Sequence, residues 1–219
     1  MKRKTFTMLI AFAVVMFSCN SQAKKDQPVP NNTPSVIVGG GCDGCEIMYI
    51  NMPENILPVD TSAGWNEKGQ KLLVSGTVYK KDGKIPAENV IIYYWQTDNN
   101  GLYSPIAGMD ERAKRHGHIR GWIKTGKDGR YALYTIRPAP YPNADNPAHI
   151  HISIKEPDIY NEYYIDEFVF DDDVLLTPAI RKQHENRGGS GILQITSTGN
   201  LQTAMHNITL GLNIPGYPQ

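Results

Sequence analysis

Residues 141–154 read YPNADNPAHIHISI, and the second half of this stretch alternates as a β-strand does. Side chains on a strand point to opposite faces in turn, so His149 and His151 share one face and the isoleucines that follow each of them share the other. The isoleucine face is suited to a buried core, and the histidine face to a cleft. Two imidazoles at this spacing, roughly 7 Å apart along the strand, can lean onto one metal ion.

A His-x-His pair alone is weak evidence, but two tyrosines accompany it. Tyr141 follows a proline-rich turn just upstream, and Tyr103 ends the segment WQTDNNGLY directly after an apolar strand. Imidazole suits several transition metals, whereas anionic oxygen favours a hard, highly charged ion. A free phenol has a pKa of about 10, and Fe(III) can hold it as phenolate because positive charge favours the anion. The alternative is that the tyrosines pack at strand ends and the histidines are incidental.

Three segments then occur in a characteristic order. They are WQTDNNGLY (95–103), GKDGRYALYTIRPAPYP (126–142) and PAHIHISI (147–154). Together they resemble the intradiol ring-cleavage dioxygenases, and the resemblance covers residues 71–173, about half of the chain. It implies a β-sandwich fold and matches four iron ligands: Tyr103, Tyr141, His149 and His151.

The resemblance also implies a reaction. A catechol-like aromatic diol would displace Tyr141 from Fe(3+), and Tyr141 would act as a general base as well as a ligand. With O2, the ring would be cleaved between its two oxygenated carbons to give a muconate-type diacid. Phenolate bound to ferric iron would colour the protein burgundy.

Three positions depart from the family pattern. Asn146 and Trp122 stand where arginines are expected, and Glu167 falls near an expected glutamine. Such groups stabilise developing charge, and losing one typically costs a few kcal/mol of barrier, so an iron-binding protein with poor turnover is a third interpretation. The candidate replacements are Arg120, Arg137, His116 and His118. Within that set, the favoured interpretation of the two histidines is a solvated basic loop. His184 and His206 are given no role.

The N-terminus predicts export. Residues 1–18 have a basic start and a short apolar run, as a signal peptide does, and Cys19 follows where a bacterial lipoprotein is cleaved and lipidated. The alternative is an ordinary signal peptide with an incidental cysteine. We expect lipid on Cys19 to anchor the protein in the cell envelope, with residues 19–38 as a flexible tether and residues 39–219 as the sandwich domain.

A second cysteine motif follows the tether. Cys42 and Cys45 form a Cys-x-x-Cys pair in GGGCDGC. In an exported protein such a pair predicts a short-loop disulfide. A zinc ribbon would need a second pair, and a thioredoxin-like site would need a surrounding βαβ pattern.

The rest of the chain predicts an all-β sandwich. Short apolar strands alternate with turn signals, and a helical turn is expected at 175–182, limited by Pro178. The net charge is zero, so no nucleic-acid partner is expected, and the oligomeric state is left open. The alternative function is a non-catalytic cell-surface module similar to carboxypeptidase regulatory-like domains, which GTVYKKDGKIPAENVIIYYW (76–95) and KDGRYALY (127–134) also fit. Such a module has no use for Tyr141 and the histidine pair.

Overall fold

The computed structural model describes residues 37–219. The predicted signal segment, Cys19 and the tether up to residue 36 lie outside the described residues and stay predictions. Val38 was expected in the tether, but it is buried and its backbone N–H donates to the side-chain carbonyl of Asn161. The folded domain therefore begins before residue 39. In the described part of the chain, no helix has the length and apolar character needed to cross a bilayer.

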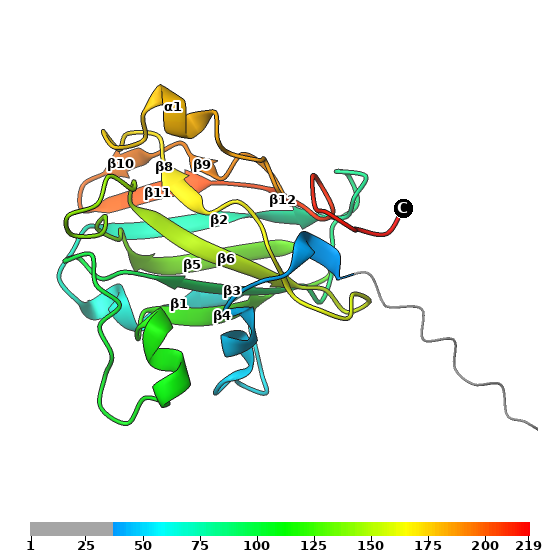
Figure 1. The fold of residues 1–219 in the computed structure, drawn as a ribbon, viewed down its shortest axis with the longest axis horizontal. Coiled ribbons are helices and arrows are strands. Elements are labelled where there is room, and N and C mark those ends of the chain that lie inside the picture. Colours follow the sequence, from blue (N-terminus) through cyan, green and yellow to red (C-terminus); the bar gives the residue numbers. More distant parts are fainter. Residues whose placement is uncertain (1–36) are drawn as a thin grey trace, which may run out of the picture. The chain divides into compact units, whose positions relative to one another are not determined.

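The described residues form a sandwich of two mixed six-stranded sheets (Figure 1), so the predicted all-β sandwich is confirmed. The order in the first sheet is β1 (Val59–Thr61), β5 (Arg130–Ile136), β2 (Lys71–Tyr79), β11 (Leu201–Met205) and β10 (Thr196–Thr198), with β12 (Ile208–Thr209) also paired with β2. The order in the second sheet is β4 (Arg120–Lys124), β3 (Ile91–Gln96), β6 (His149–Lys155), β8 (Phe168–Phe170) and β9 (Ile192–Leu193), with β7 (Tyr163–Tyr164) also paired with β6.

Helical structure is limited to short segments. The 3-10 turns are η1 (Val38–Gly40), η2 (Cys45–Tyr49), η3 (Ala63–Asn66) and η4 (Glu111–His116), and the α-helix is α1 (Pro178–Arg181). Pro178 was expected to limit the helical turn, but it begins α1, where its missing N–H costs no hydrogen bond. The Thr177 hydroxyl caps the helix by accepting from the backbone N–H of Ile180.

The core explains the sequence pattern of two neighbouring strands. The three isoleucines of β6 are buried between the sheets, where each contributes about 1.5–3 kcal/mol relative to an exposed side chain. On β3, Ile92 and Tyr94 face the same core, whereas Tyr93 and Trp95 are buried on the opposite face. β3 is apolar on both faces because the outer side of its sheet is covered as well.

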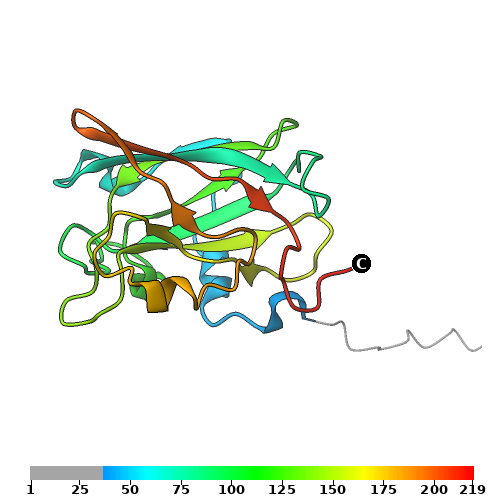
Figure 2. The ribbon, with the colours of Figure 1, turned by 90° about the horizontal axis from the view of Figure 1, so that it is seen from above.

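That cover is the N-terminal segment of the domain, residues 37–50, which contains η1 and η2. Figure 2 shows it (blue) on the side of the second sheet that faces away from the first. Trp122 donates its indole N–H to the carbonyl of Met48, and the Arg120 guanidinium donates to the carbonyls of Ile47 and Ile50. The segment closes the outer face over β3 and β4. It leaves the beginning of β6, which carries His149 and His151, beside a cavity.

The cysteine motif lies in the same covering segment. Cys42 and Cys45 are joined in a disulfide, with their Cα atoms 5.5 Å apart. Cys45 is fully buried, and its sulfur accepts a hydrogen bond from the hydroxyl of Ser153 on β6 at 3.3 Å. The disulfide loop is thus attached to the strand that carries the histidine pair.

His206, between β11 and β12, predicts how stability depends on pH. Its ring packs edge-on against Phe168 at 4.9 Å, and burial lowers its pKa from 6.5 to about 4. The unfolded chain binds a proton near pH 6.5 and the folded chain only near pH 4. The free energy of unfolding is therefore independent of this ring above about pH 6.5. It falls as the pH is lowered from 6.5 toward 4, by up to about 1.4 kcal/mol per pH unit.

We expect His206→Gln to lose part of that acid dependence. Urea unfolding at pH 6.5 and at pH 4.5 should show a smaller fall in the free energy of unfolding for the variant than for the wild type. The remaining titratable groups are common to both proteins, so the difference isolates this ring. Equal falls in the two proteins would contradict the assignment.

Candidate metal centre

Four side chains from three separate parts of the chain converge on one point. They are Tyr103 after β3, Tyr141 before β6, and His149 and His151 on β6. The two phenol oxygens are 2.6 Å apart, and His151 Nε2 lies 2.8 Å from Tyr103 Oη and 3.3 Å from Tyr141 Oη. His149 Nε2 lies 2.9 Å from Tyr141 Oη and 3.2 Å from His151 Nε2. The structure therefore brings together all four ligands that the sequence predicts.

The hydrogen bonds of the two histidines leave both Nε2 atoms as acceptors. Nδ1 of His149 is 2.7 Å from the carbonyl oxygen of Pro147, which can only accept, so Nδ1 carries the proton. Nδ1 of His151 is 2.7 Å from Oε1 of Glu167. The bond from His151 lowers the pKa of Glu167 despite its burial, so the carboxylate is ionised and also accepts. Both Nε2 lone pairs can thus accept, from the phenol hydroxyls or from a cation, and the two nitrogens lie 3.2 Å apart.

The phenols indicate what kind of cation fits. Burial raises the pKa of Tyr103 and of Tyr141, so neither ionises without a strong positive charge nearby. Atoms bonded to one ion at about 2 Å lie roughly 3 Å from one another, as these four do. Two imidazoles and two phenols therefore fit a hard, highly charged metal ion. Glu167 completes a His149–His151–Glu167 group with ligand atoms within 4.8 Å, but its bond to Nδ1 makes it the partner that orients His151.

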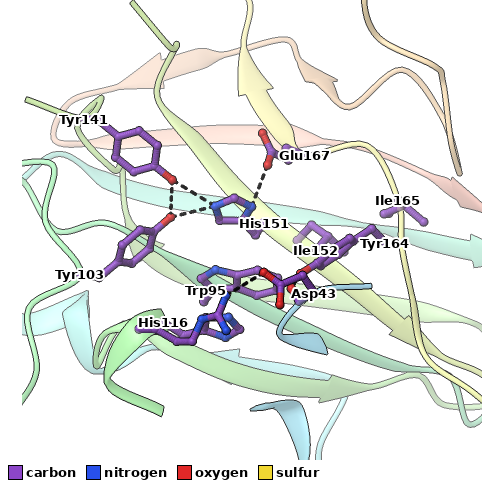
Figure 3. A pocket seen from close by; sticks show the side chains of 11 residues that line it. Asp43, Trp95, Tyr103, His116, Tyr141, His151, Ile152, Tyr164, Ile165 and Glu167 are labelled. Carbon is purple, nitrogen blue, oxygen red and sulfur yellow. Dashed lines mark hydrogen bonds and ion pairs between the residues drawn. The ribbon is translucent and has the colours of Figure 1, made fainter. Parts of the chain in front are cut away.

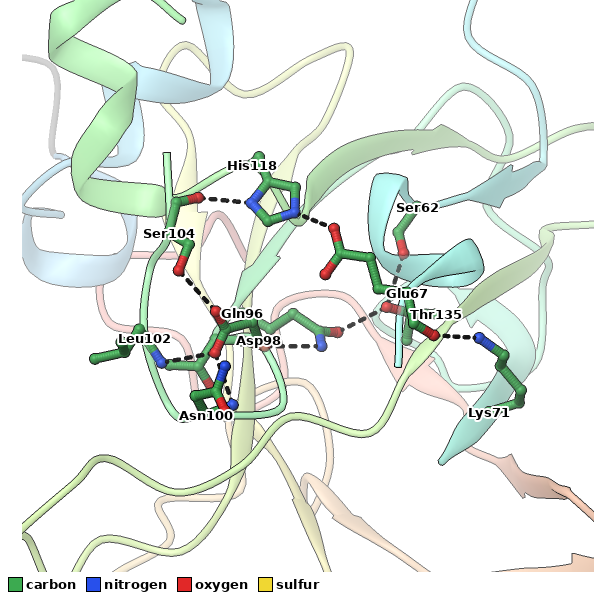
Figure 4. A network of polar contacts seen from close by, with 11 residues as sticks. Ser62, Glu67, Lys71, Gln96, Asp98, Asn100, Leu102, Ser104, His118 and Thr135 are labelled. Atoms are coloured by element: carbon green, nitrogen blue, oxygen red, sulfur yellow. Dashed lines mark hydrogen bonds and ion pairs between the residues drawn. The ribbon is translucent and has the colours of Figure 1, made fainter. Parts of the chain in front are cut away.

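The loop between β3 and Tyr103 is shaped by Asp98 (Figure 4). Its carboxylate accepts from the backbone N–H groups of Asn100 and Leu102 and from the hydroxyl of Ser104. Gly101 has φ +79, and a Cβ there would lie 2.1 Å from the carbonyl oxygen of Pro140. Only glycine allows this approach, and the approach places Tyr103 beside the segment that carries Tyr141.

The histidines of the 104–120 loop are not solvated, which corrects the sequence interpretation. His118 bonds the Ser104 carbonyl through Nδ1 and Glu67 through Nε2 (Figure 4). Burial opposes its protonation, but these two partners raise its pKa. His118 therefore ties the Tyr103 loop to Glu67, the residue that follows η3.

His116 is 4% exposed and lies in a stack of three rings. It packs on Trp95 at 4.1 Å and 4°, and Trp95 packs on His151 at 4.6 Å and 11°. Burial lowers the pKa of His116 to about 3, so the ring is neutral. From the sequence, His116 was only a candidate replacement for an arginine and Trp95 had no role, because a stack between a 3-10 turn and two strands leaves no periodic signal, although Trp95 pairs with His151 in the β3–β6 register.

A cavity of about 360 Å³ is lined by three of the four converging side chains, Tyr103, Tyr141 and His151 (Figure 3). Besides the metal centre, its walls are formed by Trp95, Ile152, Tyr164, Ile165, Glu167, His116, Arg115 and Asp43. It is large enough for a small aromatic molecule. The Cys42–Cys45 loop supplies Asp43, whose carbonyl accepts from the hydroxyl of Tyr164.

The departures from the family pattern lie at different places. Asn146 is exposed, and neither it nor Trp122 lines the cavity. Trp122 packs with Tyr93 instead. Glu167 does line the cavity. Of the four candidate replacements for the missing arginines, His116 alone is a cavity wall, since Arg120 bonds backbone carbonyls and Arg137 pairs with Asp172.

A protein-family model described as "Dioxygenase" matches residues 50–187, which include all four converging side chains. The chain belongs to the intradiol ring-cleavage dioxygenases. Among curated members, it is 30% identical over 114 residues to the protocatechuate 3,4-dioxygenase beta chain of Burkholderia cepacia, covering 49% of this chain and 48% of that protein. It is 27% identical over 122 residues to catechol 1,2-dioxygenase 1 of Acinetobacter lwoffii, covering 54% and 35%. The chain thus spans half or less of the length of these two relatives.

Solved structures of intradiol dioxygenases share the fold. The dioxygenase domain of a dioxygenase–carbohydrate-binding protein fusion from a Streptomyces species is 24% identical, with a TM-score of 0.52, and the match covers 73% of this chain and 91% of that one. Hydroxyquinol 1,2-dioxygenase of Pseudomonas putida is 20% identical, with a TM-score of 0.52, covering 73% and 62%. At these identities the likeness concerns the fold alone.

Proposed function

We propose that this protein is a non-haem Fe(III) intradiol dioxygenase that cleaves a catechol-type aromatic ring with O2 to a muconate-type diacid. One observation carries the proposal: the convergence of Tyr103, Tyr141, His149 and His151 beside a ring-sized cavity. These four residues would hold the iron. Ferric iron, when bound, supplies the activation of the diol ring toward O2.

The protein's own residues would bind and deprotonate the substrate. Tyr141 Oη lies at the cavity and bonds Tyr103 and His149, so as phenolate it can accept a proton from a diol hydroxyl. Trp95 and Tyr164 offer aromatic walls that can hold an aromatic ring and exclude water. Glu167 keeps the Nε2 lone pair of His151 directed at the metal.

The substrate class rests on the chemistry of the site and on the relatives. Those relatives are named for protocatechuate, catechol and hydroxyquinol, all aromatic compounds with adjacent hydroxyl groups. A polar end with four ligands and an apolar wall formed by Trp95 suit such a diol. The carboxypeptidase-regulatory-like alternative gives no reason for four ligand side chains to converge.

Metal analysis combined with a visible spectrum tests the proposal. We expect about one iron per chain, a broad visible band from phenolate bound to Fe(III), and a shift to longer wavelength when catechol is added without O2. Admitting O2 should consume one O2 per catechol and give a product 32 mass units heavier. A colourless iron-loaded protein, or catechol without effect on the band, would contradict the ligand assignment.

A further inference from the structure

The hydrogen bonds around His116 fix which of its ring nitrogens is a donor. Tyr93 Oη lies 2.9 Å from Nδ1 of His116 and accepts a hydrogen bond from the Arg120 guanidinium at 3.2 Å. A guanidinium can only donate, and Nδ1 is the one acceptor bonded to the Tyr93 hydroxyl among residues 37–219, so the buried hydroxyl directs its proton to Nδ1. Burial raises the pKa of Tyr93 to about 12, and that proton stays in place. Since the ring is neutral, its own proton is on Nε2.

The Nε2–H group belongs to a ring that lines the cavity. It has no hydrogen-bond partner among residues 37–219, yet no fully buried side-chain nitrogen or oxygen in this range lacks a partner. Nε2 therefore keeps some exposed surface, and His116, which is 4% exposed overall, is one of the residues that line the cavity. Gly44, with φ +83, lies opposite, and a Cβ there would come within 3.3 Å of Nε2.

The ring stack sets the place of this donor relative to the metal centre. Figure 3 shows His116 on the side of Trp95 that faces away from His151. The donor and the metal centre thus lie on opposite sides of one indole, within the same cavity. A substituent on an aromatic ring held at the metal centre can extend across the edge of Trp95 toward Nε2.

We propose that His116 is a specificity-determining residue, which donates Nε2–H to a hydrogen-bond acceptor on a ring substituent of the diol. The proposal rests on the proposed function, because it takes the diol to be held at the metal centre. Catechols with a carbonyl-type acceptor on the ring are favoured over those with a methyl group, which displaces water from Nε2 without replacing its hydrogen bond. Arg115 also lines the cavity but is a less suitable donor to this substituent, since its exposed side chain already pairs with Asp43 at 3.0 Å.

Binding of two probes of similar size tests the proposal. The dissociation constants of 3,4-dihydroxybenzaldehyde and 4-methylcatechol are measured by calorimetry without O2, on iron-loaded wild type, His116→Phe and His116→Gln. The wild-type preference for the aldehyde should fall about three- to tenfold in His116→Phe, which keeps a flat ring on Trp95 but has no donor. His116→Gln can accept from Tyr93 and still donate, so it should keep most of the preference. The intrinsic difference between the probes is the same for every variant and cancels. An unchanged preference in His116→Phe would overturn the proposal.

A measurement on the wild type covers the case in which His116→Phe does not fold. In protein labelled with ¹⁵N-histidine and loaded with diamagnetic gallium(III), the Nε2–H resonance of His116 should shift with the aldehyde and stay nearly still with 4-methylcatechol. Equal shifts would overturn the proposal. If the protein cleaves the ring but His116 does not affect the preference for the aldehyde, this inference alone is wrong. If the preference depends on His116 but no ring is cleaved, only the proposed function is wrong.

Discussion

The variant Tyr141→Phe should lose ring cleavage by about 10²–10⁴-fold and should show a weaker visible band. The rate falls by this amount because the phenol oxygen that takes the diol proton is removed, and general-base catalysis typically contributes that factor. The band weakens because one of two phenolate ligands is lost. The ring of Tyr141 is half-buried and its packing against His149 at 5.0 Å does not need the hydroxyl, so the variant should fold.

A matched tyrosine separates this effect from a general loss of phenol groups. Tyr134 on β5 packs edge-on against Trp65 at 5.4 Å and does not line the cavity. Tyr134→Phe should therefore keep the wild-type band, iron content and turnover. Oxygen uptake with catechol, measured on all three proteins at equal iron content, gives the comparison. An active and fully coloured Tyr141→Phe protein would remove Tyr141 from the ligand set.

Sequence patterns were sufficient where short-range rules decide the structure. The two-residue period of HIHISI places the isoleucines in the core and the histidines on the other face, as observed on β6. The shared face of His149 and His151 follows from the same rule, so half of the candidate site needed only strand geometry.

Other parts of the site depend on contacts between distant segments. The N-terminal loop at Asp43 reaches the cavity because Trp122 and Arg120 on β4 bond the carbonyls of Met48 and Ile47 in η2, and no local pattern encodes that. His116 follows basic residues in a loop of irregular sequence, so composition suggested a solvated chain. It is buried because Trp95 offers its outer face to the ring. One signal was available: a strand as apolar as β3 on both faces requires a cover on its outer face, which the N-terminal segment and His116 provide.

The double variant His149→Ala, His151→Ala should lose stoichiometric iron. Removing a hydrogen-bond partner of a ligand typically costs 10–100-fold in metal affinity, so removing both nitrogen ligands should cost more than about 100-fold. Iron per chain, measured after dialysis against metal-free buffer, should fall to a small fraction of the wild-type value. Circular dichroism should keep the β-sheet signal, because both side chains point away from the isoleucine core of β6.

Two further substitutions grade the effect and control for it. Glu167→Ala removes the acceptor for Nδ1 of His151 but leaves all four ligands, so iron affinity should fall by about 10–100-fold. His184→Ala removes a half-buried histidine that pairs with Asp166 and not with the centre, so iron content should stay at the wild-type level. The expected order of affinity is wild type equal to His184→Ala, then Glu167→Ala, then the double variant. A folded double variant that keeps one iron per chain would show that the metal is held elsewhere, because the two nitrogens that face each other at 3.2 Å would then have no part in binding it.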